Sequence, residues 1–286
     1  MGLTNSASNA IFNNIAWRYD RVNTVLSFGL HEVWRARLAR AFPAGTRSLL
    51  DLACGTGAIP LAFLRYRTDV TDLTGLDLSV QMLKIASQRL LNNGNHHLFS
   101  KSGDLIRCVG ADFMSALRSG DNSSVCLSCR ADTRSAPTLD KSLDLLHNYS
   151  PLVRLIEGDA LNLTFKDDSF DAVTVGFALR NIPDVIKLLT SAYRVLKPGG
   201  YFGILEFSRP KALITRAFYW LYLSCIVPIV GLLITGNWAA YYHLGKSIKQ
   251  FPEPERFHRM LAQSGFKEIT AYPLALGAVT LYMAKK

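Results

Sequence analysis

The sequence predicts an α/β protein with a mostly parallel sheet and helices on both faces. Three observations support this fold class: short apolar runs typical of buried parallel strands, helical stretches between them, and glycine-containing turns that join the two. The chain has 286 residues, 49% of them hydrophobic, and is long enough to bury one large core. We expect a single domain over residues 1–286.

The predicted elements alternate along the chain in the order expected for such a sheet. Apolar runs typical of parallel strands lie at 48–53, 73–77, 153–160, 170–176 and 201–207. Helical spacing occurs at 31–42, 59–66 and 185–196, and a Lys-Pro-Gly-Gly turn is expected at 197–200. Residues 266–272 and 277–284 predict a final antiparallel pair, which brings the sheet to seven strands.

The turn after the first predicted strand indicates a ligand site. Asp51 stands near the carboxyl end of that strand, and Gly55 and Gly57 follow in the run D-L-A-C-G-T-G. Glycines permit a tight turn and the close approach of a ligand, and open α/β sheets bind ligands at this edge. Asp77 ends the second predicted strand roughly 20 residues later, the offset expected for a carboxylate that accepts from ribose hydroxyls.

The pattern differs from that of a dinucleotide-binding dehydrogenase. The G-x-G-x-x-G phosphate cradle is missing, and Pro60 stands where a third glycine would let helix and strand pack closely. A pocket rich in carboxylates suits a cationic sulfonium nucleoside, so we predict S-adenosylmethionine as the cofactor. The third predicted strand ends at Asp159, whose carboxylate can accept from the adenine amine, and Ala160, whose N–H can donate to a ring nitrogen.

The charge and the cysteine content of the chain indicate which partners, cellular compartment and metal sites to expect. A formal net charge of +10 favours anionic partners such as acidic lipid headgroups, phosphorylated substrates or nucleic acid. Five irregularly placed cysteines and the lack of a secretory signal at the start indicate a cytoplasmic protein. Cys126 and Cys129 form a lone C-x-x-C without a second ligand pair, so we expect no metal site.

Three segments fall outside the strand and helix alternation. Residues 1–45 predict a helical substrate cap, and residues 92–150, rich in Ser, Asn, Asp and Gly, predict a partly disordered insertion. Residues 209–250 predict an apolar helical lid around the uncharged run 217–235. That run is close to the length of a membrane span, but it falls between two strands of one sheet, so we expect it to dip into the membrane interface.

Several motifs carry a resemblance to a known family. D-L-A-C-G-T-G, G-L-D-L-S, E-G-D-A, F-D-A-V and R-V-L-K-P-G-G are similar to motifs of class I S-adenosylmethionine-dependent methyltransferases. The stretches F-N-N-I-A-W-R-Y-D-R-V-N-T-V-L-S-F-G-L-H, G-F-A-L-R-N-I-P-D and L-E-F-S-R-P resemble the ubiquinone/menaquinone biosynthesis C-methyltransferase family. This resemblance implies a Rossmann-like, seven-stranded, mostly parallel sheet with an antiparallel last strand.

The resemblance also implies a reaction and a set of cofactor contacts. The substrate would be a polyprenylated quinol, either demethylmenaquinol or a methoxy-polyprenyl-benzoquinol, methylated at a ring carbon. The cofactor would contact Thr56, Asp77, Asp159, Ala160 and Gly176, the last where the family often has Ser. The segment 92–150 is longer than the family's usual connection, and 236–242 lacks the family's common acidic residue after Asn.

Methyl transfer to carbon requires an activated ring. A methyl sulfonium is already reactive, so the enzyme mainly aligns the reactants and stabilises a phenolate. Arg180 is the first candidate, because it follows the fourth strand at the ligand edge and can hold an oxyanion. Further candidates for hydrogen bonding or proton removal are Tyr19, Asp20, Asn23, Tyr241 and His243. Structural roles are the alternative for each of these: packing, helix capping or surface exposure.

Two other functions stay open from the sequence. The chain could methylate RNA or another small molecule, although it carries no N/D-P-P-Y motif and no added RNA-binding module. It could also be a noncatalytic scaffold of a quinone pathway. If the chain is a quinol methyltransferase, we expect a polyprenyl quinol as its substrate and peripheral binding to a membrane surface. We also expect a homodimer or a quinone-biosynthesis complex, and no nucleic-acid partner.

Overall fold

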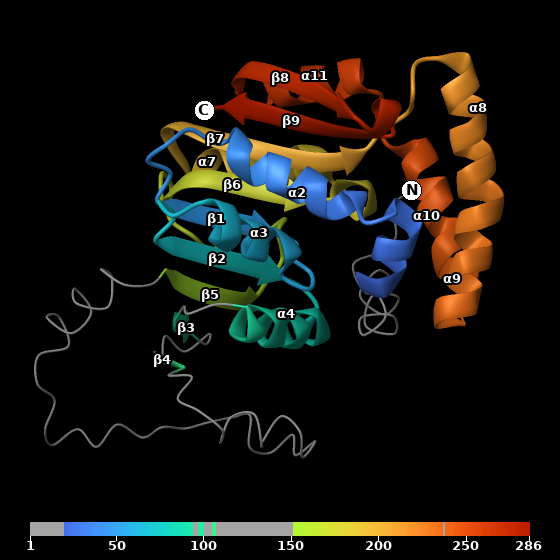
Figure 1. Ribbon diagram of the computed structural model, residues 1–286. Helices are drawn as coiled ribbons and strands as arrows, with labels where there is room; N and C mark the ends of the chain where they lie inside the picture. The colour runs from blue at the N-terminus through green and yellow to red at the C-terminus, as the bar shows by residue number, and fades with distance from the viewer. Residues whose placement is uncertain (1–19, 94–96, 100–104, 107–150, 237) are drawn as a thin grey trace, which may run out of the picture.

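The computed structural model describes residues 20–93, 97–99, 105–106, 151–236 and 238–286 (Figure 1). Tyr19, Cys126, Cys129 and most of the segment 92–150 lie outside these residues.

One twisted sheet forms the centre of the described structure, with strand order β4-β3-β5-β2-β1-β6-β7-β9-β8. The strands are β1 Ser48–Leu52, β2 Asp72–Asp77, β3 His97–Phe99, β4 Leu105–Ile106, β5 Leu152–Glu157, β6 Phe170–Gly176, β7 Leu196–Phe207, β8 Lys267–Leu274 and β9 Val279–Lys285. The strands β1, β2, β5, β6 and β7 pair in parallel, and β9 is antiparallel to both β7 and β8. The predicted seven-stranded sheet is therefore confirmed, and β3 and β4 add a short edge pair that the sequence did not reveal.

Helices cover both faces of the sheet, as predicted. The helices are α2 Leu30–Ala41, α3 Ala58–Tyr66, α4 Val80–Asn92, α7 Val185–Val195, α8 Leu213–Leu221, α9 Val227–Thr235, α10 Trp238–Gln250 and α11 Pro254–Gln263. One core cluster joins the sheet to α7 and α11 through Leu188 and Phe257, and another joins it to α2 and α3 through Leu38 and Phe63. Successive residues of a strand serve opposite clusters, because neighbouring side chains point to opposite faces.

Local sequence signals explain where several helices begin. Ser79 accepts a hydrogen bond from the Met82 N–H at 3.1 Å and caps α4. Asp184 accepts from the Lys187 N–H at 2.9 Å and caps α7. Side-chain oxygens of this kind satisfy N–H groups that have no partner in the first helical turn. These caps fix the start of helices that follow β2 and β6.

The Lys-Pro-Gly-Gly turn predicted at 197–200 is incorporated into β7. Gly199 has a positive φ of 77°, and the pairing of β6 with β7 shifts register between Phe170 and Ala172. The Gly199 N–H donates to the Lys286 carbonyl at 3.2 Å, and the Lys286 N–H donates to the Gly200 carbonyl at 2.9 Å. The end of the chain therefore completes the backbone pairing of a segment that would otherwise leave the sheet.

An antiparallel helical pair stands at the carboxyl ends of the parallel strands (Figure 1). A π-helical turn, Tyr222–Ile226, joins α8 to α9, so that Leu213–Thr235 runs as one long helix. Gly236 then ends this helix with φ 73°, and α10 packs back against α9. We call Leu213–Gln250 the helical hairpin. It packs on the N-terminal helical residues 20–27 through a cluster that includes Val22, Leu223 and Tyr241.

Leu50→Ala should destabilise the protein strongly. Leu50 is fully buried in β1, at the centre of the sheet, and removing its isobutyl group there costs about 2–5 kcal/mol in lost burial and residual cavity. Urea unfolding followed by circular dichroism measures the change. The control is Leu213→Ala, because Leu213 is 71% exposed and its truncation should leave the midpoint nearly unchanged. Equal midpoints for the two variants would contradict the assigned core.

Candidate active site

The glycine turn after β1 is built for close contact with a ligand. Gly55 and Gly57 have φ values of 54° and 73°, which favour glycine. A Cβ added at Gly57 would lie 2.9 Å from the Ala86 Cβ, so the turn packs directly on α4. Ala53 also has a positive φ, of 52°, and such backbone strain in a non-glycine residue is common at functional sites.

Asp77 joins the glycine turn to the next helix. Its Oδ2 accepts from the Gly55 N–H and its Oδ1 from the Ser79 N–H, each at 2.8 Å. Burial raises the pKa of Asp77, and these two hydrogen bonds oppose that rise. Each carboxylate oxygen has a second lone pair, so Asp77 can still accept from a ribose diol.

Asp51 carries an orphaned buried oxygen at the same edge of the sheet. Its Oδ1 accepts from the Thr174 hydroxyl at 2.7 Å, whereas its Oδ2 is buried without a hydrogen-bond partner among the described residues. Burial raises the pKa of Asp51 to about 8, the Thr174 hydrogen bond opposes the rise, and the charge of Asp77 adds to it. A buried carboxylate in this condition favours a cationic ligand.

The strands β5 and β6 complete this edge. Asp159 follows β5, where its Oδ1 accepts from the Leu161 N–H at 2.9 Å, and Ala160 is buried beside it. A Cβ added at Gly176 would lie 2.3 Å from the Ile59 Cδ1, so a side chain there would require the end of the Ile59 side chain to move. The structure therefore brings the predicted cofactor residues of four neighbouring strands to one edge of the sheet.

Asp20 lies beside the cofactor turn. Thr56 donates a hydrogen bond from its hydroxyl to the Asp20 Oδ1 at 3.0 Å, and Arg89 forms an ion pair with the Asp20 Oδ2. Arg89 also donates to the Thr56 hydroxyl at 3.0 Å. The sequence prediction grouped Asp20 with catalytic candidates, but the structure places it on Thr56, outside the lining of the cavity described next.

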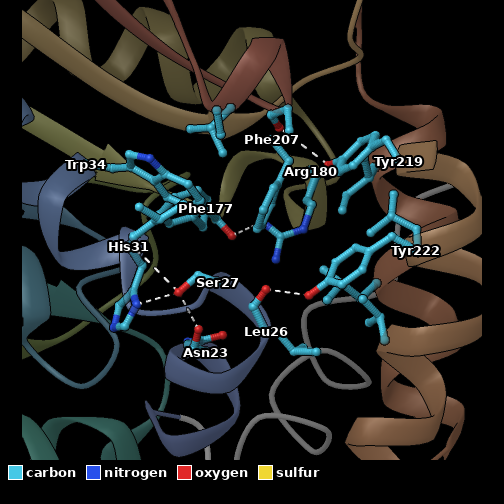
Figure 2. A pocket seen from close by; sticks show the side chains of 18 of the residues that line it. Asn23, Leu26, Ser27, His31, Trp34, Phe177, Arg180, Phe207, Tyr219 and Tyr222 are labelled. Carbon is cyan, nitrogen blue, oxygen red and sulfur yellow. Dashed lines mark hydrogen bonds between the residues drawn. The ribbon is translucent and has the colours of Figure 1, made fainter. Parts of the chain in front are cut away.

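A cavity of about 480 Å³ lies between the N-terminal helices, the sheet edge and the helical hairpin. Its lining is mostly apolar and aromatic and includes Leu26, Trp34, Phe177, Phe207, Tyr219, Tyr222, Leu223, Val227, Leu244 and Ile248. Figure 2 shows Asn23, Ser27 and His31 on one side and Tyr219 and Tyr222, from the hairpin, on the other. The Tyr222 hydroxyl donates to the Leu26 carbonyl and joins the two sides.

Arg180 brings a buried cation into this cavity. Its side chain is 6% exposed, and its Nη1 lies 2.9 Å from the Oε1 of Glu206, which is fully buried. The same guanidinium donates to the Phe177 carbonyl and lies over the Phe207 ring at 5.0 Å. Its Nε has no hydrogen-bond partner among the described residues, so a donor is left for a ligand. In Figure 2 the guanidinium points toward the space between Ser27 and Tyr222.

Three further predicted residues line the cavity. Asn23 lies in the N-terminal helix, and Tyr241 and His243 lie in α10. The Tyr241 ring packs on Gly231, where an added Cβ would lie 2.1 Å from the ring. Burial lowers the pKa of His243, and the nearby charges of Arg180 and Lys246 lower it further. A neutral imidazole can accept a proton.

The sequence prediction did not include several residues of the site. Trp34, Arg35, Tyr219 and Tyr222 line the cavity, and Glu206 anchors Arg180. The acidic residue at position 206, inside an otherwise apolar strand, was the available signal for an internal ion pair. Phe177 adds a positive φ of 56° directly after Gly176.

Comparison with known proteins identifies the fold and the family. A possible histamine N-methyltransferase from Thermotoga maritima superposes with a TM-score of 0.54 at 16% identity, covering 97% of this chain and 99% of that one. A putative S-adenosylmethionine-dependent methyltransferase from Methanococcus maripaludis gives 0.54 at 14% identity, covering 96% and 94%. At sequence identities this low, the structural similarity establishes the fold alone.

Sequence relatives are closer. The ubiquinone/menaquinone biosynthesis C-methyltransferase UbiE of Rickettsia felis is 32% identical over 281 residues, which cover 97% of this chain and 92% of that protein. The demethylmenaquinone methyltransferase of Staphylococcus aureus is 29% identical over 278 residues, which cover 96% and 91%. The sequence model of the ubiE/COQ5 methyltransferase family matches residues 1–148 and 147–286. This chain belongs to the ubiE/COQ5 methyltransferase family and is an S-adenosylmethionine-dependent methyltransferase.

Proposed function

We propose that this enzyme methylates a ring carbon of a polyprenylated quinol, either demethylmenaquinol or a methoxy-polyprenyl-benzoquinol. The observation that carries the proposal is the buried guanidinium of Arg180 in a cavity lined mostly by apolar and aromatic residues next to the cofactor edge. A quinol ring needs aromatic walls and one cation for its ionised hydroxyl, and a prenyl tail needs apolar surface. Two relatives support this substrate class: the ubiquinone/menaquinone biosynthesis C-methyltransferase of Rickettsia felis and the demethylmenaquinone methyltransferase of Staphylococcus aureus.

The residues at the sheet edge fit S-adenosylmethionine. We assign Asp77 to the ribose, Asp159 and Ala160 to the adenine, and Asp51 to the ammonium group of the methionine part. Gly55, Thr56 and Gly57 form the turn against which the nucleoside packs, and Gly176 lies at the end of β6, in contact with the Ile59 side chain. The bound cofactor supplies a methyl group on a positively charged sulfur.

Arg180 acts on the acceptor. Its guanidinium holds the developing phenolate, and this charge makes the neighbouring ring carbon nucleophilic. Glu206 keeps the guanidinium in place through the buried ion pair. The candidates for hydrogen bonding to the ring or for proton removal are Tyr19, Asp20, Asn23, Tyr241 and His243. Among them His243 suits proton removal, because burial lowers its pKa and so favours the neutral imidazole.

The alternative functions fit the site less well. An RNA substrate would require a basic, open surface at the cofactor edge, whereas the cavity beside that edge is lined mostly by apolar and aromatic residues, several of them from the hairpin. A noncatalytic scaffold has no need for the orphaned Asp51 oxygen and the strained backbone at Ala53 and Phe177. We therefore expect no nucleic-acid partner. A homodimer or a quinone-biosynthesis complex stays a prediction.

We further propose that the protein binds the cytoplasmic surface of a membrane peripherally. Among the described residues, Leu213–Thr235 is a 23-residue helix apolar enough to span a bilayer, and only 22% of its most apolar window is buried. Its exposed apolar residues outside the cavity lining, which we call the outer face, are Leu213, Ile214, Leu221, Ile226, Ile229, Leu232 and Leu233. The net charge of +10 favours anionic lipid.

Replacing Arg180 should abolish most catalysis. Arg180→Met is combined with Glu206→Gln, because the single change would leave Glu206 buried as an unpaired charge. We expect kcat with demethylmenaquinol to fall about 100- to 1,000-fold, with cofactor affinity retained. Methyl transfer from radiolabelled cofactor to a short-chain quinol measures it. Arg216→Met serves as the control, because Arg216 is exposed on α8. If the wild-type protein does not methylate the quinol, the proposed substrate is refuted.

Cofactor binding should release a proton near neutral pH. The empty protein keeps Asp51 protonated up to about pH 8, and a bound ammonium favours the charged carboxylate. Affinity for S-adenosylhomocysteine should therefore rise as the pH increases from 6 to 8, and Asp51→Asn should remove this dependence. Calorimetry in buffers of different ionisation enthalpy measures the released proton. 5′-Methylthioadenosine, which lacks the ammonium, should release none, and equal release for both ligands would contradict the Asp51 assignment.

The outer face of the hairpin should carry membrane binding. Leu233→Glu places a charge where a side chain is 79% exposed, and we expect cosedimentation with vesicles of phosphatidylcholine and phosphatidylglycerol to decrease. Cofactor affinity should not change, because Leu233 lies outside the cavity lining. Val33→Glu, at an exposed position of α2, is the matched control. Unchanged sedimentation of Leu233→Glu would argue against this surface.

A further inference from the structure

Arg35 is a buried arginine at the junction of the cofactor edge and the cavity. It lies in α2, its side chain is 7% exposed, and it contributes to the cavity lining. Arg37 and Arg40 in the same helix are exposed. Burying a guanidinium is costly unless anionic groups compensate for the lost water. The local charges must therefore account for its position.

The charged residues that interact with Arg35 or with its partner Glu32 come from α2, α4 and β1. Arg35 Nη1 lies 3.0 Å from Glu32 Oε1, and the pKa of Glu32 falls to about 2, mainly through its hydrogen bond with His31 and also through the charges of Arg35 and Arg89. Glu32 is 57% exposed, so water screens much of this pair. The charge of Arg35 also acts on buried Asp51, in β1, and lowers its pKa. Arg35 therefore lies close enough to Asp51 to affect its charge, in addition to its ion pair with Glu32.

Bound S-adenosylmethionine carries charged groups that complement both Asp51 and Arg35. The methionine part of S-adenosylmethionine ends in an ammonium and a carboxylate on one carbon atom, so the groups that bind them must lie close together. Asp51 offers the buried anion for the ammonium. Arg35 offers a buried cation near Asp51, and the planar fork of a guanidinium suits two-point binding of a carboxylate.

We propose that Arg35 binds the α-carboxylate of S-adenosylmethionine and, with it, fixes the direction in which the methyl group enters the cavity. The proposal rests on the cofactor assignment and not on the identity of the quinol. Because α2 also supplies His31 and Trp34 to the cavity wall, this contact connects the cofactor with the N-terminal cap over the acceptor. Arg180 then serves the acceptor and Arg35 the cofactor.

Two ligands that differ only in the carboxylate test the proposal. S-adenosylhomocysteine carries it, and decarboxylated S-adenosylhomocysteine keeps the amine but lacks it. Calorimetric titration of wild-type protein should show about 10- to 100-fold tighter binding of the first ligand, the effect of one charge-assisted contact. Arg35→Met should remove this preference by weakening S-adenosylhomocysteine alone, and Arg35→Lys should retain part of it.

Controls separate this role from a structural one. Arg37→Met, on the exposed side of α2, should bind both ligands like the wild type. Equal affinity of wild-type protein for the two ligands would overturn the proposal, and this comparison needs no variant that must fold. An Arg35→Met protein that loses both ligands to the same extent, or neither, would also overturn it. Each result is independent of quinol turnover, so the proposed substrate and the Arg35 contact can fail separately.

Discussion

The site depends on one constraint: parallel strands place all their carboxyl ends at the same edge of the sheet. Residues that follow β1, β2, β5 and β6 come from widely separated parts of the chain, yet the strand order makes these four ends neighbours. Asp51 and Asp77 are therefore buried close together, and the charge of Asp77 raises the cost of ionising Asp51. Asp51 is therefore protonated near neutral pH in the empty protein, and a bound cation favours its charged form. The cofactor of this family carries positive charge at both its sulfonium and its ammonium. The orphaned Asp51 oxygen is thus best understood as half of a contact.

Compensation of buried charge also explains the acceptor side of the site. Arg180 is almost fully buried, and the equally buried Glu206 makes that position tolerable. Glu206 also accepts from the Arg180 and Phe207 N–H groups, so the pair is attached to backbone on both η1, Leu179–Asn181, and β7. This attachment limits the freedom of the guanidinium. A preorganised cation in an apolar cavity stabilises developing charge more than a solvated one, because it does not reorient during the reaction.

The sequence predicted seven strands of the sheet and the bounds of α2, α3 and α7, because these depend on local apolar runs and helical spacing. It also placed the candidate cofactor residues at strand ends that the sheet brings to one edge. It did not predict relations between distant residues. Glu206 lies 26 residues from Arg180, and the Asp20–Arg89 pair spans 69 residues, so neither partner could be found from spacing. Arg35 resembled any basic residue of an amphipathic helix until the fold showed it buried. The Lys-Pro-Gly-Gly signal was correct for Gly199, whose φ is positive, but pairing with the distant Lys286 kept the segment in the sheet.

The connection of the hairpin decides how its apolar helix can meet a membrane. β7 precedes the hairpin and β8 follows it, and both belong to one sheet through β9. A single crossing by Leu213–Thr235 would therefore separate strands that pair within the same core, and α10 instead returns along α9 toward the sheet. The helix can lie along the interface with its outer face in lipid, while Tyr219, Tyr222 and Leu223 on its inner side line the cavity. In the proposed arrangement, Leu213–Thr235 lies between the bilayer and the cavity.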